Sequence, residues 1–221
     1  VCFRGRAGGA QSVDYVRVLK VDGTDANHIA ATNSWDADGT LSFWDFAPML
    51  YTFDTTGGWD VPGNWFEGVL PAATDNIIVP NGITCTLNGS ETINDVTIPS
   101  GGIIVVGGNT FTVNGASDID GTITISTGTV DANGAFDATN GTITFSDAGN
   151  LNLFSAVTDL GTLSTTNGTV TYDGVDQTVF SDIYYSLTAG GGSGTKTLGG
   201  NVTVANDFTI DTLVTTVMGG N

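Results

Sequence analysis

The residues best suited to chemistry in this sequence are the acidic residues of one short segment, SWDADGTLSFWD at 34–45. Calcium binds about six to eight oxygen atoms, and the EF-hand loop supplies them from alternate positions around a glycine at the sixth. If Ser34 is the first position, Gly39 is the sixth and Asp45 the twelfth. The segment therefore predicts a calcium loop with the ligands Ser34, Asp36, Asp38, Thr40 and Asp45. The alternative is an acidic surface turn, because the first position is serine and no flanking helices are predicted.

Asp118 and Asp120 are a second candidate pair, since residues two positions apart project from the same side of an extended segment. Paired carboxylates at a suitable separation hydrolyse glycosidic bonds. However, Asp120 begins an Asp-Gly dipeptide, so a corner of the chain explains the pair equally well. A lyase would need a base, but no Lys or Arg lies between residues 21 and 195, and His28 is the single histidine. We therefore predict no catalytic residues, with a polysaccharide-degrading enzyme as a lesser alternative.

The charge of the chain restricts its partners. The formal net charge is −18, with only five Lys and Arg residues. Phosphate-rich partners gain no counterion release or Coulomb attraction from such a surface. We therefore expect no nucleic-acid binding and no membrane insertion, and a divalent cation such as calcium is the natural charged partner. Cys2 and Cys85 are too few for a disulfide framework, and whether they form a single bridge stays open.

Repeated strand motifs predict the architecture. The segments GTITI (121–125), GTITF (141–145) and GTVTY (168–172) are near copies, and TFTV (110–113) and NVTV (201–204) follow the same pattern. With a period of two, the apolar residues lie on one face and the threonines on the other. The expected inward residues are Ile123, Ile125, Ile143, Phe145, Val170 and Tyr172.

Such repeats are typical of a solenoid, in which each rung buries its apolar face only against its neighbours. The intervals between comparable strands, roughly 20 to 27 residues, favour a right-handed parallel β-helix over a strict hexapeptide repeat. Ten Asn-Gly and Asp-Gly dipeptides would supply left-handed backbone at the corners, but they also suit hairpins. Antiparallel β-sandwich modules are therefore the alternative fold.

The two ends of the chain differ from the repeats between them. Residues 1–58 hold eight of the 20 aromatic residues and predict a distinct N-terminal cap or neighbouring module, with a strand over 13–21 and a loop over 24–40. Residues 59–221 are expected to form the solenoid. Because MGGN at 218–221 restarts the pattern of VGGN at 106–109, we expect the solenoid to be truncated there or completed by another molecule.

The segment from Trp59 to about Gly121 resembles the β-solenoid repeat regions of large secreted bacterial surface and adhesin-type proteins, which are often exported by the type IX route. The likeness rests on GGWDVPGNWFEGVLPAATDNIIVP at 57–80, with its W-x5-W-x2-G-x2-P-x3-D spacing from Trp59 to Asp75. The resemblance implies that the Trp pair and the Pro cap the first coil. It also implies an extracellular location on a bacterial cell surface, and binding or scaffolding as the activity.

Threonine pairs recur along the chain, at 84/86, 110/112, 122/124, 142/144, 169/171 and 195/197. Stacked Thr-x-Thr rows could match an ice lattice, but threonine is also a common outward residue of strands, and these pairs are unevenly spaced. We therefore expect an extracellular structural or adhesive protein without catalysis, whose partner is itself or a glycan or other surface ligand. The alternative is a self-assembling filament subunit, and ice binding is a lesser one.

Overall fold

The computed structural model describes residues 48–191, 193–212 and 214–217, together with the backbone of five short strands before residue 47. The chain divides into two compact units, Val1–Leu50 and Tyr51–Asn221. In the first unit, β1 (Ser12–Asp14), β3 (Ile29–Thr32) and β5 (Trp44–Phe46) form a parallel sheet, and β2 (Arg17–Val18) pairs with β4 (Trp35–Asp36). The prediction of a loop over 24–40 is wrong where β3 and β4 lie, because pairing with distant strands overrides a weak local pattern.

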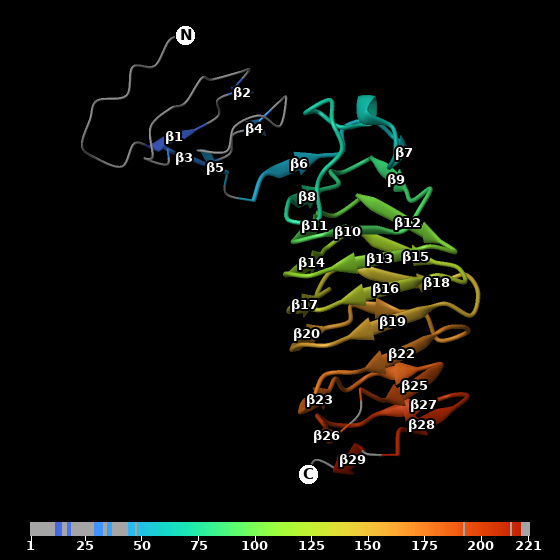
Figure 1. Cartoon of the computed structure of the whole chain (residues 1–221). Coiled ribbons are helices and arrows are strands. Elements are labelled where there is room, and N and C mark those ends of the chain that lie inside the picture. The colour runs from blue at the N-terminus through green and yellow to red at the C-terminus, as the bar shows by residue number, and fades with distance from the viewer. Residues whose placement is uncertain are drawn as a thin grey trace. The chain divides into compact units, whose positions relative to one another are not determined.

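The second unit is a parallel β-solenoid of about seven turns, in which most turns contribute one strand to each of three sheets (Figure 1). We call these sheets face 1, face 2 and face 3. Face 1 consists of β6 (Leu50–Thr52), β8 (Asn76–Ile78), β11 (Val96–Ile98), β14 (Ser117–Ile119), β17 (Phe136–Asp137) and β20 (Val157–Asp159). Face 2 consists of β7 (Gly57–Gly58), β9 (Thr84–Thr86), β12 (Ile103–Gly107), β15 (Thr122–Ile125), β18 (Thr142–Phe145) and β21 (Thr162–Leu163).

Face 3 is the longest sheet. It consists of β10 (Glu91–Ile93), β13 (Thr110–Val113), β16 (Thr129–Ala132), β19 (Asn150–Leu153), β22 (Thr169–Tyr172), β25 (Ser186–Ala189) and β28 (Phe208–Ile210). After β21 the other two faces are replaced by new sheets, formed by β23 (Gln177–Val179), β26 (Gly194–Leu198) and β29 (Val214–Val217), and by β24 (Ile183–Tyr184) and β27 (Thr203–Val204). Face 3 therefore holds the two parts of the solenoid together.

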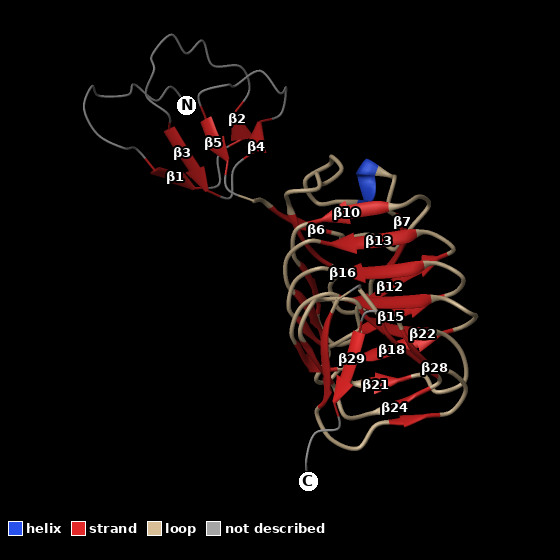
Figure 2. Cartoon of the chain, turned by 60° about the horizontal axis from the view of Figure 1, so that its bottom comes forward, coloured by secondary structure: helices blue, strands red, loops and turns tan. Residues whose placement is uncertain are grey.

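The pairing of the strands confirms the solenoid prediction and excludes the antiparallel sandwich. Every strand pair found among the described residues is parallel, and the one antiparallel contact is an isolated bridge between Phe53 and Trp65. Figure 2 shows the stacked strands joined by loops, with the short 3₁₀ helix η1 (Pro62–Asn64) at the end where β7 and β10 lie. Among the described residues, no helix has the length and apolarity needed to span a membrane.

The core is built from ladders of aligned apolar residues. Ile104 pairs with Ile123 and Ile123 with Ile143, and all three are fully buried. Burying each such side chain contributes roughly 1.5–3 kcal/mol. The six residues predicted to face inward are all buried, which confirms the period-two interpretation.

The near-copied motifs lie on different faces, and this explains why their spacing is uneven. GTITI and GTITF form β15 and β18 on face 2, whereas GTVTY forms β22 on face 3. Intervals measured between these motifs therefore mix whole turns with parts of a turn. The register within one face gives a turn of about 20 residues, close to the short end of the predicted range.

Glycines at the corners serve mainly to let neighbouring turns approach. Of the glycines in the predicted Asn-Gly and Asp-Gly corners within the described residues, only Gly82 and Gly168 have positive φ, at 78° and 81°. At Gly134 the backbone conformation is ordinary, but a Cβ atom would overlap the carbonyl oxygen of Gly115 on the adjacent turn. Close backbone approach, rather than left-handed conformation, requires glycine there.

An aromatic cluster closes the end of the solenoid where β7 lies. The ring of Trp65 is edge-on to Phe53 at 4.9 Å and to Trp59 at 4.8 Å between centroids, and its Nε1 donates a hydrogen bond to the Trp59 carbonyl oxygen at 2.8 Å. Trp59 in turn contacts Phe111 in face 3. Both tryptophans are fully buried, so they form the core of this end. Strands β6 and β7 precede Trp59 and belong to the solenoid, so the structure places the boundary between units at Leu50.

Candidate functional site

The best candidate for a binding surface is the outward side of face 2, where hydroxyl and methyl groups form two parallel columns. Five of its six strands each place two outward side chains on either side of a buried one, whereas β7 consists of two glycines. We call this set the threonine face. Its first column is Thr84, Ile103, Thr122, Thr142 and Thr162, and its second is Thr86, Val105, Thr124, Thr144 and Ser164.

The register of the strands fixes the spacing of this array. Thr122 pairs with Thr142 and Thr124 with Thr144, so the same side chains repeat on successive turns. Neighbouring strands of a sheet are about 4.8 Å apart, and residues two positions apart along a strand are about 6.6 Å apart. The threonine face is therefore a two-dimensional grid with two constant repeats.

No charged or amide side chain interrupts the threonine face, although the chain carries 23 acidic residues. Face 3 also carries threonines in its two outward columns, but both columns are interrupted. Asp131 and Asn152 lie between Thr112 and Thr171 in one column, and Asn150 lies between Thr129 and Thr169 in the other. Threonine is common on the strands of both faces, as its β-propensity leads us to expect. The absence of Asp and Asn from the outward positions is what distinguishes face 2.

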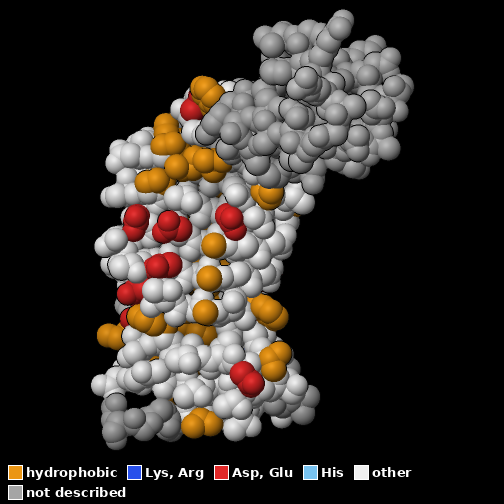
Figure 3. Space-filling model, turned by 90° about the vertical axis from the view of Figure 1, so that its left-hand side faces the viewer, with side chains coloured by type: hydrophobic (Ala, Val, Ile, Leu, Met, Phe, Trp, Pro, Cys, Tyr) orange, Lys and Arg blue, Asp and Glu red, His pale blue; other side chains and the backbone are white. Residues whose placement is uncertain are grey.

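Face 1 carries the opposite arrangement, a column of carboxylates. Asp118 pairs with Asp137 and Asp137 with Asp159, so three acidic residues follow one another on successive turns. Figure 3 views the solenoid from this side and shows acidic side chains gathered there. Asp137 accepts a hydrogen bond from the Thr139 N–H at 3.0 Å, and Asp159 accepts one from the Gly161 N–H at 2.8 Å. Two of the three carboxylates therefore stabilise the turns that follow them.

Within the part of the chain that the structure describes, no group of three or more His, Cys, Asp and Glu side chains could hold a metal ion. Asp120, the second member of the predicted pair, accepts a hydrogen bond from Asn140 Nδ2 on the next turn at 3.0 Å. This contact supports the interpretation of Asp120 as a corner residue.

The predicted calcium ligands Ser34, Asp38 and Thr40 lie outside the described residues. Asp36 ends β4 and Asp45 lies in the middle of β5, where only the backbone is described. The calcium loop therefore stays a prediction.

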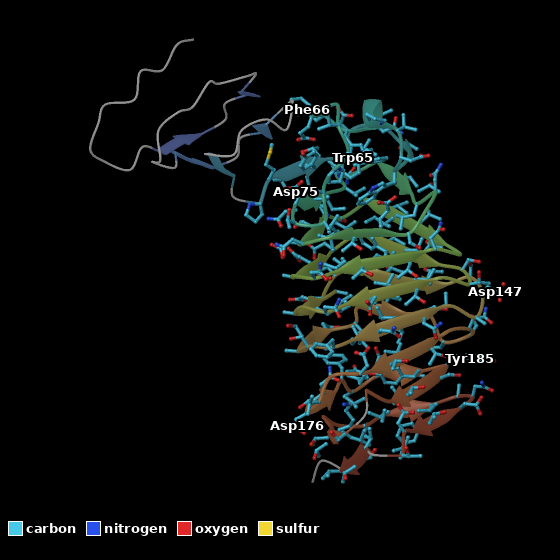
Figure 4. All side chains as sticks on the ribbon, viewed as in Figure 1. Trp65, Phe66, Asp75, Asp147, Asp176 and Tyr185 are labelled. Atoms are coloured by element: carbon cyan, nitrogen blue, oxygen red, sulfur yellow. The ribbon has the colours of Figure 1, made fainter. Side chains whose placement is uncertain are left out.

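The tryptophans of the W-x5-W motif do not lie on the surface. Trp59 and Trp65 are buried, whereas Phe66, the residue next to Trp65, is 76% exposed (Figure 4). Asp75, at the end of the motif, accepts a hydrogen bond from the Ala72 N–H at 2.9 Å. For this pair of tryptophans, stacking on sugars is excluded in the folded state; the side chains of Trp35 and Trp44 lie outside the described residues.

A buried lysine was not anticipated from the sequence. Lys196 is fully buried, and its ammonium group donates hydrogen bonds to the carbonyl oxygens of Gly174 and of Val175, the latter at 3.0 Å. Burial lowers the pKa of this lysine, against the raising effect of nearby acidic groups such as Asp173. The signal was present in the sequence, because Lys196 lies between Thr195 and Thr197 just as Ile123 lies between two outward threonines.

Buried hydroxyl groups join the two parts of the solenoid where faces 1 and 2 end. The hydroxyl groups of Tyr172 and Tyr184 are 3.1 Å apart; that of Tyr184 donates to the Phe180 carbonyl oxygen at 2.7 Å, and that of Tyr172 accepts from the Phe180 N–H at 3.0 Å. Burial raises the pKa of Tyr172 to about 12. Gln177 Nε2 adds hydrogen bonds to the carbonyl oxygens of Leu153 and Ser155. These contacts replace sheet hydrogen bonds at the break.

Burial raises the pKa of several carboxyl groups and of the one described cysteine. Desolvation raises the pKa of four partly buried carboxyl groups, those of Glu67, Glu91, Asp173 and Asp182. Cys85 lies in β9, is fully buried and has a free thiol whose pKa is raised by burial. Such a thiol is unreactive at neutral pH. Cys2 lies outside the described residues.

Comparisons of the chain with protein-family models, with curated proteins and with solved structures found no match.

Proposed function

We propose that this chain is a non-catalytic structural and adhesive segment of a bacterial cell-surface protein, and that the threonine face is its contact surface. The observation that carries the proposal is the repetition of the same uncharged outward side chains on successive turns of face 2. A grid of this kind has no unique residue at which a reaction could occur. It offers many equal contacts to a repetitive ligand, and many weak contacts made together give strong retention.

The extracellular location and the bacterial origin rest on the Trp-rich motif described above. The net charge of −18 supports the same assignment, because it favours solubility of an exposed elongated chain. Calcium bound at residues 34–45 is part of the proposal, with Ser34, Asp36, Asp38, Thr40 and Asp45 as ligands.

The proposal is tested by incubating the fluorescently labelled chain with a glycan array and with insoluble polysaccharide particles, while released sugar is measured in the same samples. We expect retention on at least one surface with no release of sugar. Turnover of any polysaccharide would contradict the non-catalytic assignment. Absence of retention on every surface, ice included, would contradict the adhesive one.

A filament subunit is the second candidate, and the exposure of β28 favours it. Phe208 pairs with Leu187 and Ile210 with Ala189, and these partners are fully buried. Phe208 and Ile210 themselves are 46% and 47% exposed. A rung from a second copy could cover them and pair with β28, which is the last strand of face 3 among the described residues. Electron microscopy of the purified chain would distinguish the two functions: uniform fibres support the filament, and isolated short particles contradict it.

A further inference from the structure

We propose that the threonine face binds ice. This inference rests on the proposed adhesive function and names its ligand class. Adhesion to another surface does not depend on it, so the two can fail separately.

The main objection to ice binding is the uneven spacing of the threonine pairs along the sequence, and the register of face 2 removes it. Along the sequence the threonine pairs are unevenly spaced, but they belong to three different sheets. The pairs 122/124 and 142/144 lie on adjacent strands of face 2, whereas 110/112 and 169/171 lie on face 3. On face 2 alone the rows are in register over five successive strands. The spacing is therefore regular where a lattice would contact it.

The dimensions and stiffness of the array suit a crystalline ligand. Repeats of about 4.8 Å across the strands and about 6.6 Å along them are fixed by the backbone. The repeat across the strands is close to the shorter repeat between oxygen positions on the prism face of hexagonal ice, and the repeat along the strands is somewhat below the longer one. Thr, Val and Ile are stiff at χ1 because of their branched Cβ atoms, and aligned neighbours restrict them further. Ile103 and Val105 interrupt the threonines but keep branched side chains of similar shape in the grid.

The chemistry of the threonine face also favours ice over the alternatives. A charged side chain holds a hydration shell of its own, which would not fit the water positions of a crystal. Face 2 has no charged residue among its ten outward positions, whereas Asp131 lies on face 3 and Asp118 on face 1. The same ten positions contain no aromatic ring on which a sugar could stack. Methyl groups that order nearby water and hydroxyl groups that hydrogen-bond to it are the chemistry that remains.

The inference is tested by partition into growing ice. The labelled chain is placed in dilute buffer, ice is grown slowly on a cold surface, and the concentrations of protein in ice and liquid are compared. We expect enrichment of the wild-type chain in the ice fraction. Thr124→Tyr, in the centre of the threonine face, should abolish the enrichment because the ring lifts the surface off the lattice. The matched control Thr171→Tyr, on face 3, should leave it unchanged.

Thermal unfolding of both variants shows whether they are folded. If Thr124→Tyr is destabilised, Thr144→Lys, with a flexible charged side chain on the adjacent strand, takes its place. Exclusion of the wild-type chain from ice would overturn the inference, and so would equal behaviour of the variants on the two faces. If the chain is excluded from ice but retained on the glycan array, the ice inference fails and the proposed adhesive function stands.

Discussion

At the capped end of the solenoid, substitution of Trp65 should lower the free energy of unfolding most. Trp65 is fully buried, it contacts Tyr51, Phe53 and Trp59 edge-on, and its indole N–H is hydrogen-bonded to a backbone carbonyl oxygen. Replacing a buried Trp by Ala typically costs about 3–5 kcal/mol. Because a folded domain is stable by only about 5–15 kcal/mol, Trp65→Ala should remove a large part of the free energy of unfolding.

A second variant separates the ring from the hydrogen bond. Trp65→Phe keeps an aromatic ring in the cluster but leaves the Trp59 carbonyl oxygen without its partner, and an unsatisfied buried acceptor costs about 1–3 kcal/mol. The control is Phe66→Ala, which removes the adjacent exposed ring and should change stability by no more than about 0.5 kcal/mol.

The measurement is urea unfolding followed by circular dichroism, which does not depend on the tryptophans themselves. The expected order of stability is wild type and Phe66→Ala, then Trp65→Phe, then Trp65→Ala. If Trp65→Ala unfolded within about 1 kcal/mol of the wild type, the aromatic cluster would not be the closing core of the solenoid.

Three further predictions concern the glycines, the carboxyl groups and the calcium loop. Gly134→Ala should prevent correct stacking of the turns, measured as a loss of soluble folded protein. Gly63→Ala should be tolerated, because a Cβ atom there meets nothing within 4 Å. Equal yields of the two variants would refute the role of close backbone approach at Gly134. The four carboxyl groups with raised pKa bind protons more readily in the folded state, so stability should rise as the pH falls from 7 toward 4; a falling thermal midpoint would contradict this. EDTA should lower the melting temperature of the calcium-loaded chain, because calcium at a hundred times its dissociation constant stabilises the folded state by about 2.7 kcal/mol. Asp38→Asn should reduce that response. An unchanged melting temperature would contradict calcium binding at residues 34–45.

The fold could be predicted because the sequence alternates with a period of two and each strand repeats its neighbour's pattern. The buried positions of Ile123, Ile143 and Val170 followed directly from that alternation. The assignment of strands to faces could not be predicted, since GTITF and GTVTY are near copies and yet lie on different sheets. Which face a strand joins depends on the lengths of the intervening turns, and a local motif carries no information about them.

The threonine face could be predicted only in part, for the same reason. The threonine pairs were apparent, but their alignment on face 2 is a property of register, which is set by pairing between turns. The role of glycine also differed from the prediction: at Gly134 the requirement comes from the backbone of another turn, about 20 residues away in the sequence. The burial of Lys196 was not anticipated, because lysine is almost never fully buried.

Blocking one face at a time tests whether the chain adheres through its threonine face. Single cysteines are introduced as Thr124→Cys or Thr171→Cys in a chain that also carries Cys2→Ser, and each is modified with a polyethylene glycol maleimide; Cys85 does not compete because its thiol is buried. Retention on the glycan array and polysaccharide particles is then compared with that of the unmodified proteins. We expect modification at position 124 to abolish retention and modification at position 171 to leave it unchanged. Equal retention of the two modified proteins would contradict adhesion through the threonine face.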